Sequence, residues 1–213
     1  MLFIPSQIEV NTDTNLGGTY AGYTFTVTKI ADEGFYYFNA SNTGGIVLAL
    51  PSTVTEIGDK AISSYNLGKT KELRFYEVDS STGNPKWENG SLVFDDSNNK
   101  LRTIGSNNFT PTYPLTKLPI GPELETLGEW AFGPKSQSGG NANITSIDFS
   151  ECTNLKKLPD NLFCNMANLT SLVLPPNLEE IGAIWGTEYN SYGSAPNYNG
   201  QNHVLTGLDF SKV

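Results

Sequence analysis

The sequence of 213 residues is poor in charge, with 16% charged side chains, and it contains two cysteines and one histidine. Its 13 Lys and Arg stand against 22 Asp and Glu, which gives a formal charge of -9 at pH 7. Nucleic-acid binding requires clustered Lys and Arg to neutralise phosphates, and here the basic residues are scattered. We therefore expect no nucleic-acid partner.

Long apolar runs are also missing from the sequence. No run approaches the roughly 18 to 20 residues that span a bilayer, so we expect no transmembrane segment. The first residues, MLFIPSQIEV, lack the basic region and long apolar stretch of a secretory signal. Either a signal has been removed or export uses another route. Two cysteines are too few for a disulfide scaffold.

A repeat is visible directly in the amino-acid sequence. Three stretches of eleven residues align without a gap: LALPSTVTEIG (48–58), LPIGPELETLG (118–128) and LVLPPNLEEIG (172–182). Weaker copies end at Gly105 and Pro159, and the intervals 105 to 128 and 159 to 182 are both 23 residues. The repeating unit is therefore about 23 residues long.

The longer intervals are explained by a degenerate unit and by insertions. Gly58 and Gly105 are 47 residues apart, about two units, so KELRFYEVDSSTG is predicted to supply a unit whose turn ends at Gly83. Leu73 and Phe75 take its strand positions. The insertion GPKSQSGGNAN lengthens a later unit, and LTGLDFSKV (205–213) begins another. Residues 41–213 then hold about six and a half units.

The spacing within one unit predicts its shape. Leu172 and Leu174, two residues apart, share a face of a short strand that the following prolines end. Leu178 and Ile181 share one side of a helical or 3-10 turn, and Gly182 permits a sharp reversal that a side chain would obstruct. No unit buries these residues alone, so the units must stack into a β-rich solenoid.

The N-terminal residues follow another pattern. Residues 24–30 alternate polar and apolar side chains, residues 31–34 are a turn signal, and residues 35–38 are aromatic, which predicts a β-hairpin. We expect residues 1–40 to cap the solenoid of residues 41–213, and a separate binding module is the alternative.

The pattern LxLPxxLxxIGxxAF at this period resembles the leucine-rich repeats of the BspA-like bacterial surface-antigen family. The chain departs from it at Pro159, in the unit at 73–83, and at residues 184–186, where Ile-Trp-Gly replaces Ala-Phe. The resemblance implies a leucine-rich-repeat solenoid, exported or displayed by a bacterium, that serves adhesion or recognition. It brings no catalytic residues.

Catalytic and metal-binding candidates are weak. A Ser-His or Cys-His pair would need His203, which lies in an Asn- and Gly-rich stretch and is interpreted as a surface residue. Cys152 and Cys164 have no partner ligands nearby, so we predict packed thiols and no zinc. A hydrolase is thus the least favoured class, and no metal or cofactor is expected.

Carboxylate pairs occur at 32–33, 95–96 and 179–180. A solenoid offers them a shallow surface in place of the cleft that acid–base catalysis needs. The pair at 179–180 occupies the exposed polar positions of the repeat turn, so we predict that it is solvated. The run DDSNNK at 95–100 is predicted to be a polar turn, with a weak calcium site as the alternative.

The segment between Ile184 and Leu205 is the strongest binding candidate. It carries Trp185, Tyr189, Tyr192 and Tyr198 among Asn, Ser and Gly, a mixture typical of recognition loops. The alternative is that these aromatic residues pack onto the side of the solenoid. The insertion at 134–143 falls at the same point of its own unit, with Tyr65 and Tyr113 at equivalent points, so one edge should carry all of these loops.

These observations predict a non-enzymatic recognition or adhesion module at a bacterial surface or outside the cell. It would bind protein or glycan through its sheet face or its aromatic loops. The alternative is a structural or receptor-binding component of a larger particle such as a phage appendage. The strand near 205–213 would leave an edge that invites pairing with a partner.

Overall fold

The computed structural model describes residues 1–9, 24–35, 46–62, 70–109, 117–133, 144–164, 166, 168–184 and 207–209. These residues form short β-strands and one 3-10 helix. The strands are β1 (Leu2–Phe3), β2 (Gln7–Glu9), β3 (Thr24–Thr26), β4 (Lys29–Ile30), β5 (Ile46–Pro51), β6 (Glu56–Ile57), β7 (Thr70–Tyr76), β8 (Trp87–Glu88), β9 (Ser91–Leu92), β10 (Thr103–Ile104), β11 (Thr126–Leu127), β12 (Ser146–Asp148), β13 (Lys157–Leu158), β14 (Ser171–Val173), β15 (Glu180–Ile181) and β16 (Gly207–Asp209). The 3-10 helix η2 spans Asp96–Asn98.

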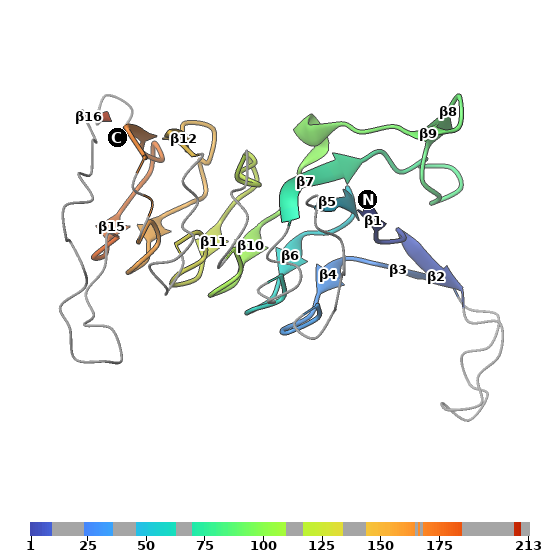
Figure 1. Cartoon of the computed structure of the whole chain (residues 1–213), viewed down its shortest axis with the longest axis horizontal. Helices are drawn as coiled ribbons and strands as arrows, with labels where there is room; N and C mark the ends of the chain where they lie inside the picture. Colours follow the sequence, from blue (N-terminus) through green and yellow to red (C-terminus); the bar gives the residue numbers. More distant parts are fainter. Residues whose placement is uncertain are drawn as a thin grey trace.

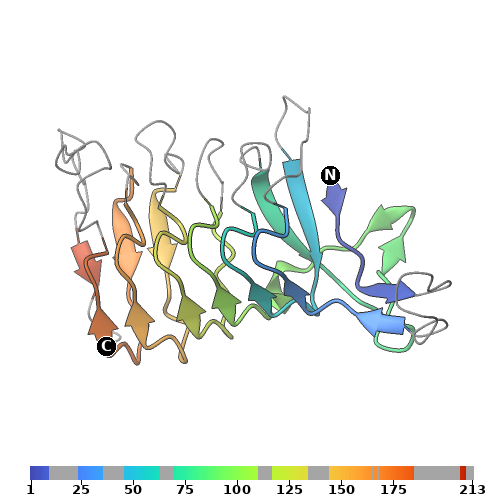
Figure 2. The same ribbon diagram turned by 90° about the horizontal axis from the view of Figure 1, so that it is seen from below.

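The strands build a solenoid with two sheet faces (Figure 1). One face, called the rung face below, consists of β4, β6, β10 and β11 in one parallel sheet and β13 with β15 in a second. The other, called the strand face, consists of the parallel sheets β1-β5-β7 and β12-β14-β16. Successive turns follow one another along the long axis (Figure 2). The predicted leucine-rich-repeat solenoid is confirmed.

One continuous core runs between the two faces. The first full unit contributes Leu48 and Leu50 from its strand, Val54 and Ile57 from its turn, and Ala61 after it, all fully buried. Later units repeat this set. Their aromatic residues form a column in which ring centroids lie 6.0 Å apart for Phe109 and Phe132 and 6.5 Å apart for Phe132 and Phe163. Each turn therefore buries the turn before it.

The glycine of each unit is required by close stacking of the turns. A Cβ atom on Gly105 would lie 2.6 Å from the carbonyl carbon of Gly58, and one on Gly182 would lie 2.9 Å from the amide nitrogen of Asp160. The left-handed residue of the turn comes two positions later, as at Lys60 with φ 54° and Asn107 with φ 56°. The reversal expected at the glycine is thus made elsewhere, by non-glycine residues.

Pro159 replaces this glycine and breaks the rung face. The N–H of Gly105 donates to the carbonyl oxygen of Ile57 at 2.7 Å, and the N–H of Gly182 donates to that of Leu158 at 2.8 Å. Proline has no N–H to donate. Accordingly, β11 and β13 belong to separate sheets.

The predicted turn ending at Gly83 is wrong. Leu73 and Phe75 pair with Leu48 and Leu50 in β5 and β7, as expected. The next turn to stack on Gly58 is nevertheless the one at Gly105, because β6 pairs directly with β10. Residues 77–95, called the excursion below, leave the stack and return to it, since the N–H of Asp95 donates to the carbonyl oxygen of Phe75 at 2.9 Å.

The predicted N-terminal hairpin is also not formed by the described residues. β3 pairs antiparallel with β2, whereas β4 pairs in parallel with β6 as the first strand of the rung face. The N–H of Phe35 donates to the carbonyl oxygen of Ala61 at 2.9 Å, so residues 29–35 form a turn of the stack. Residues 36–38 lie outside the described residues. The boundary between a cap at 1–40 and a solenoid at 41–213 stays a prediction.

Candidate functional site

The four predicted ligand-binding residues, Trp185, Tyr189, Tyr192 and Tyr198, lie outside the described residues. The two ends of their segment are placed. Ile184 is buried, and the N–H of Phe163 donates to its carbonyl oxygen at 2.8 Å. Gly207 begins β16 and pairs with Ser171 of β14. The segment is therefore tethered between the core and the strand face.

The other predicted loop residues also lie outside the described part of the chain. They are His203, Tyr65, Tyr113 and the insertion at 134–143. Gly133 and Ile144, which flank that insertion, are buried. The shared edge of the loops stays a prediction.

The N-terminal half of the strand face is covered by the excursion. Ala49 of β5 and Tyr76 of β7 point outward from the sheet, and both are fully buried there beneath Leu92. Phe3 and Phe94 pack against them. The hydroxyl of Tyr76 donates to the carbonyl oxygen of Ile4 at 2.6 Å, and burial raises its pKa to about 12. This half has a second core on its outer side.

The C-terminal half of the strand face is open in the described residues. Ser146 and Asp148 of β12 and Ser171 of β14 point outward and are exposed, and Val173 is half-buried. Their inward neighbours Ile147 and Leu172 are buried. The open half thus presents short polar side chains on parallel strands about 4.8 Å apart.

The excursion carries a hairpin that sequence reasoning missed. β8 and β9 pair antiparallel around Asn89 and Gly90, whose φ angles of 50° and 74° are those of a type I′ turn. Trp87 is 53% exposed on this hairpin, with its ring centroid 6.4 Å from that of Phe3. The Asn-Gly pair was the available signal.

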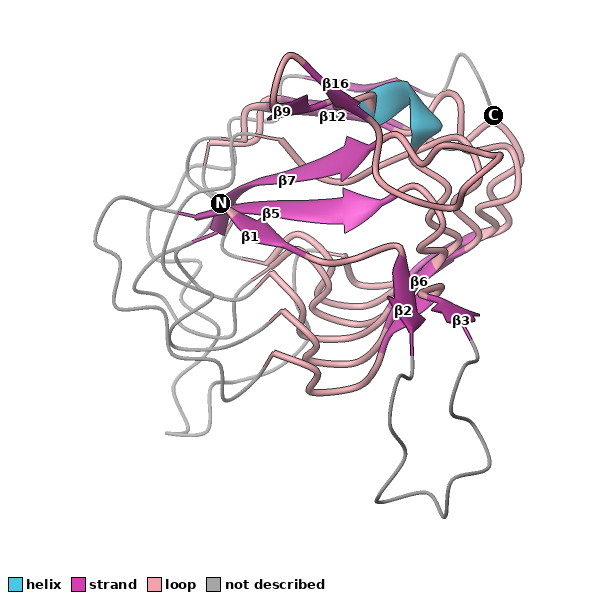
Figure 3. Cartoon of the chain, turned by 90° about the vertical axis from the view of Figure 1, so that its right-hand side faces the viewer, coloured by secondary structure: helices cyan, strands magenta, loops and turns pink. Residues whose placement is uncertain are grey.

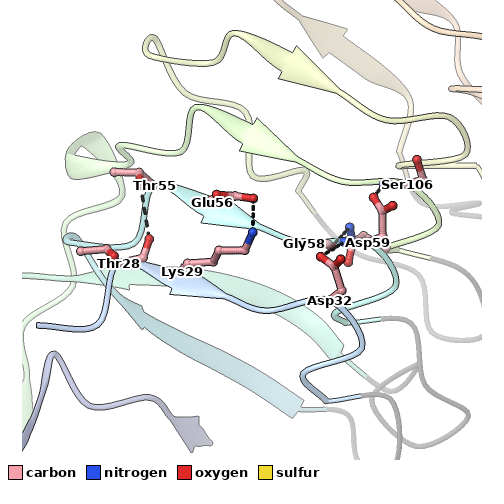
Figure 4. A network of polar contacts seen from close by, with 9 residues as sticks. Thr28, Lys29, Asp32, Thr55, Glu56, Gly58, Asp59 and Ser106 are labelled. Carbon is pink, nitrogen blue, oxygen red and sulfur yellow. Dashed lines mark hydrogen bonds and ion pairs between the residues drawn. The ribbon is translucent and has the colours of Figure 1, made fainter. Parts of the chain in front are cut away.

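Ion pairs connect neighbouring turns on the rung face. The Nζ of Lys29 lies 2.5 Å from the Oε1 of Glu56 (Figure 4). The Nζ of Lys157 lies 2.6 Å from the Oε1 of Glu180. Hydrogen bonding to these carboxylates raises the pKa of both lysines. All four side chains are substantially exposed, which confirms the prediction for Glu180 and makes the pairs weak.

Aspartates at the turn edge bind backbone groups of the next turn. The Oδ1 of Asp32 accepts from the N–H of Asp59 at 3.0 Å, and the Oδ1 of Asp59 accepts from the N–H of Ser106 at 2.7 Å (Figure 4). Asp160 accepts from the N–H of Ala183 at 2.6 Å. These carboxylates therefore stabilise the stack.

Asp95 and Asp96 form the predicted polar turn. Asp95 caps η2 by accepting from the N–H of Ser97 at 3.0 Å, and hydrogen bonds from Ser97 lower its pKa. Asp96 accepts from the Nε of Arg74 at 2.8 Å and from the N–H of Phe75 at 3.1 Å. Donors of the protein thus occupy both carboxylates, which does not support the calcium alternative.

Both cysteines are buried thiols, as predicted. Burial, with smaller contributions from Asp148 and Glu151, raises the pKa of Cys152 to about 12, and its Sγ lies 3.3 Å from the carbonyl oxygen of Gly121. The described residues contain no group of three or more His, Cys, Asp or Glu side chains suited to a metal ion. The described part of the chain also has no helix with the length and apolar character to cross a membrane.

A comparison with known protein families agrees with this architecture. The family model of the BspA type leucine rich repeat region matches six copies, over residues 23–138 and 96–185. No curated protein matches the chain. Among solved structures, the T. pallidum leucine rich repeat protein TpLRR is 18% identical, with 89% of this chain and 79% of that chain covered and a TM-score of 0.41.

Two further solved structures are similar at lower scores. A leucine rich cell surface protein from Faecalibacterium prausnitzii is 16% identical, with 85% of this chain and 65% of that chain covered and a TM-score of 0.24. A leucine-rich repeat protein from Eubacterium ventriosum is 16% identical, with 80% and 66% covered and a TM-score of 0.23. The family match spans most of the solenoid, and the chain therefore belongs to the BspA type leucine rich repeat family.

Proposed function

We propose that the chain is a recognition or adhesion module that acts at a bacterial surface or outside the cell and binds protein or glycan. The observation that carries this proposal is the open half of the strand face. There, exposed Ser146, Asp148 and Ser171 stand in register on neighbouring parallel strands. Such an array offers hydroxyl and carboxylate groups to a partner without any rearrangement of the backbone.

The aromatic segment at 185–206 is tethered at the border of this open half, because Gly207 pairs with Ser171. We propose that Trp185, Tyr189, Tyr192 and Tyr198 add aromatic contacts to the polar array. Aromatic side chains supply large contact areas, and the strand face supplies hydrogen bonds. The particle-component alternative gains no support from the family match or from the fold.

A glycan array and a panel of host matrix proteins, probed with the purified chain, test this proposal. Once a ligand is found, Ser146→Lys with Ser171→Lys should weaken binding at least tenfold, because the array is blocked. Thr126→Lys on β11 is the matched control on the rung face, where the native side chain is also exposed. Equal binding by both variants would contradict a role for the open half.

A second variant tests the aromatic segment. Replacing Tyr189, Tyr192 and Tyr198 with Ala should abolish binding and leave thermal stability nearly unchanged. A large loss of stability would show instead that the tyrosines pack against the solenoid. Absence of any ligand on both arrays would contradict the proposed function itself.

A further inference from the structure

The β8–β9 hairpin of the excursion turns on an Asn-Gly pair in open solvent. Asn89 and Gly90 are both exposed, as are Glu88 and Ser91 on either side of them. A Cβ atom on Gly90 would meet no other atom within 4 Å. Among the described residues, none accepts a hydrogen bond from the N–H of Gly90. The described part of the chain thus leaves both the backbone nitrogen of Gly90 and the side chain of Asn89 accessible.

These two groups can react with each other. The backbone nitrogen of Gly90, once deprotonated, attacks the side-chain Cγ of Asn89. The new N–Cγ bond closes a five-membered succinimide ring, and the side-chain nitrogen leaves as ammonia. Water then opens the ring. Attack of water at Cγ gives aspartate, and attack at the main-chain carbonyl carbon gives isoaspartate, in which the backbone runs through the side chain. Glycine hinders ring closure least, because it has no Cβ.

We infer that Asn89 is a site of spontaneous deamidation in the folded chain. The turn holds Asn89 in the left-handed region at φ 50°, and ring closure requires the backbone to leave that conformation. The turn opens at little cost, because β8 and β9 contribute only two residues each and a hairpin of this size has little stability of its own. The reaction should therefore proceed in the folded chain, more slowly than in the unfolded chain.

Isoaspartate at this position would disturb the hairpin. It adds a carbon atom to the backbone of a two-residue loop, and loop geometry sets the register of the strand pair. Trp87 pairs with Leu92 in this register. Leu92 packs over Ala49 of β5 and Tyr76 of β7 (Figure 3). The isoaspartyl form should thus open the second core, whereas aspartate, which keeps the backbone length and suits a type I′ turn, should not.

Peptide mapping by mass spectrometry, on the folded chain kept at mildly alkaline pH, tests the inference. We expect Asn89 to show the mass change of an amide converted to an acid, with isoaspartate as the main product. Asn84 is the matched control, because it is exposed in the same excursion but precedes Pro85, which has no N–H. Gly90→Ala should slow the conversion at least tenfold. Since this change also loosens the turn, a slower reaction reports the added Cβ.

The same chain unfolded in urea supplies the reference rate. If Asn89 stays an amide in the folded chain long after it has been converted in the unfolded chain, the inference is overturned. Conversion of Asn84 as fast as that of Asn89 would also overturn it, because water would then be hydrolysing both side chains directly.

Amide exchange tests the structural consequence. The N–H of Val93 donates to the carbonyl oxygen of Lys86 at 3.0 Å, and the N–H of Glu77 donates to that of Val93 at 2.9 Å. The purified isoaspartyl form should lose protection at both N–H groups, and Asn89→Asp should keep it. Residues 117–133 should be unchanged in both proteins. Equal protection of Val93 and Glu77 in the two proteins would overturn the predicted opening of the second core.

Discussion

The two halves of the strand face use the same repeat differently. In the N-terminal half the excursion covers the sheet, and the outward positions carry Ala49 and Tyr76. In the C-terminal half the sheet is open among the described residues, and the positions equivalent to Ala49 carry Asp148 and Val173. The inward positions are leucine, isoleucine or phenylalanine in both halves. The repeat pattern thus specifies the inner core. The outward side chains indicate instead whether other residues cover the sheet.

The largest expected effect on the free energy of unfolding comes from placing an aspartate on the outer side of each half of the strand face. Ala49→Asp buries a charge in the second core without a partner and should lower the free energy of unfolding by about 4 kcal/mol. Val173→Asp, at the equivalent position of β14, should lower it by less than about 1 kcal/mol. Urea denaturation measures both values. Equal losses would mean that the two halves are covered to the same extent.

A second pair of variants compares a covered turn with the last described turn. Ile57 is fully buried, whereas Ile181 at the equivalent position of β15 is 47% exposed. Ile57→Ala should therefore cost about 3 kcal/mol, and Ile181→Ala about 1 kcal/mol. Thermal denaturation of the two variants at equal concentration checks this. A loss at Ile181 as large as that at Ile57 would show that Ile181 is covered in solution.

A third pair compares a glycine of the stack with one of the hairpin. Gly105→Ala drives a Cβ atom against the backbone of Gly58 and Asp59 and should cost about 2 to 3 kcal/mol. Gly90→Ala meets no atom within 4 Å and should cost about 1 kcal/mol, for its positive φ of 74° alone. Chemical denaturation separates the two. A smaller loss at Gly105 would contradict close stacking of the turns.

The smallest expected effect is a pH dependence of the excursion. Hydrogen bonds from Ser81 and Thr82 lower the pKa of Asp79, and those from Ser97 lower the pKa of Asp95. Carboxylates with a lowered pKa in the folded state stabilise it above their ordinary pKa, and this stability is lost as the pH falls through the folded value. Residues 77–98 should thus lose protection from amide exchange below about pH 4, before residues 117–133 do.

Variants of one aspartate sharpen this pH test. Asp79→Asn keeps a hydrogen-bond acceptor and removes the titrating carboxyl group. The protection of residues 77–98 from amide exchange should therefore depend less on pH in this variant than in the wild type. Protection factors corrected for intrinsic exchange rates provide the measurement. An unchanged pH profile in Asp79→Asn would assign the effect to other groups.

The repeat could be predicted from sequence because its physical cause is local. Strand residues two apart and a glycine eight residues after the second strand position mark each stacked turn, and the structure places Leu48, Leu50 and Gly58 accordingly. The reason for the glycine could not be predicted, since the atoms that exclude a Cβ come from the preceding turn. For Gly105 that turn lies 47 residues earlier.

Long-range pairing also explains the errors in the N-terminal half. Residues 24–30 alternate like a hairpin strand, yet β3 pairs with β2 and β4 pairs with β6. Alternation identifies a strand without identifying its partner. Gly83 stands at the repeat spacing by coincidence, because it belongs to a tight turn outside the stack. Its carbonyl oxygen accepts from the Oγ of the distant Ser6 at 2.8 Å. The binding residues proposed at 185–198 remain a prediction.

The direct stacking of Gly105 on Gly58 has a consequence for chain entropy. The chain between the stacked residues Gly58 and Gly105 is about twice as long as the 23-residue interval between Gly105 and Gly128. Loop-closure entropy grows only with the logarithm of length, so the doubling costs about 0.6 kcal/mol. An insertion as long as one repeat unit between two stacked turns therefore destabilises the fold less than most single core substitutions do. A solenoid of this kind can thus gain new surface by insertion between turns with little loss of stability.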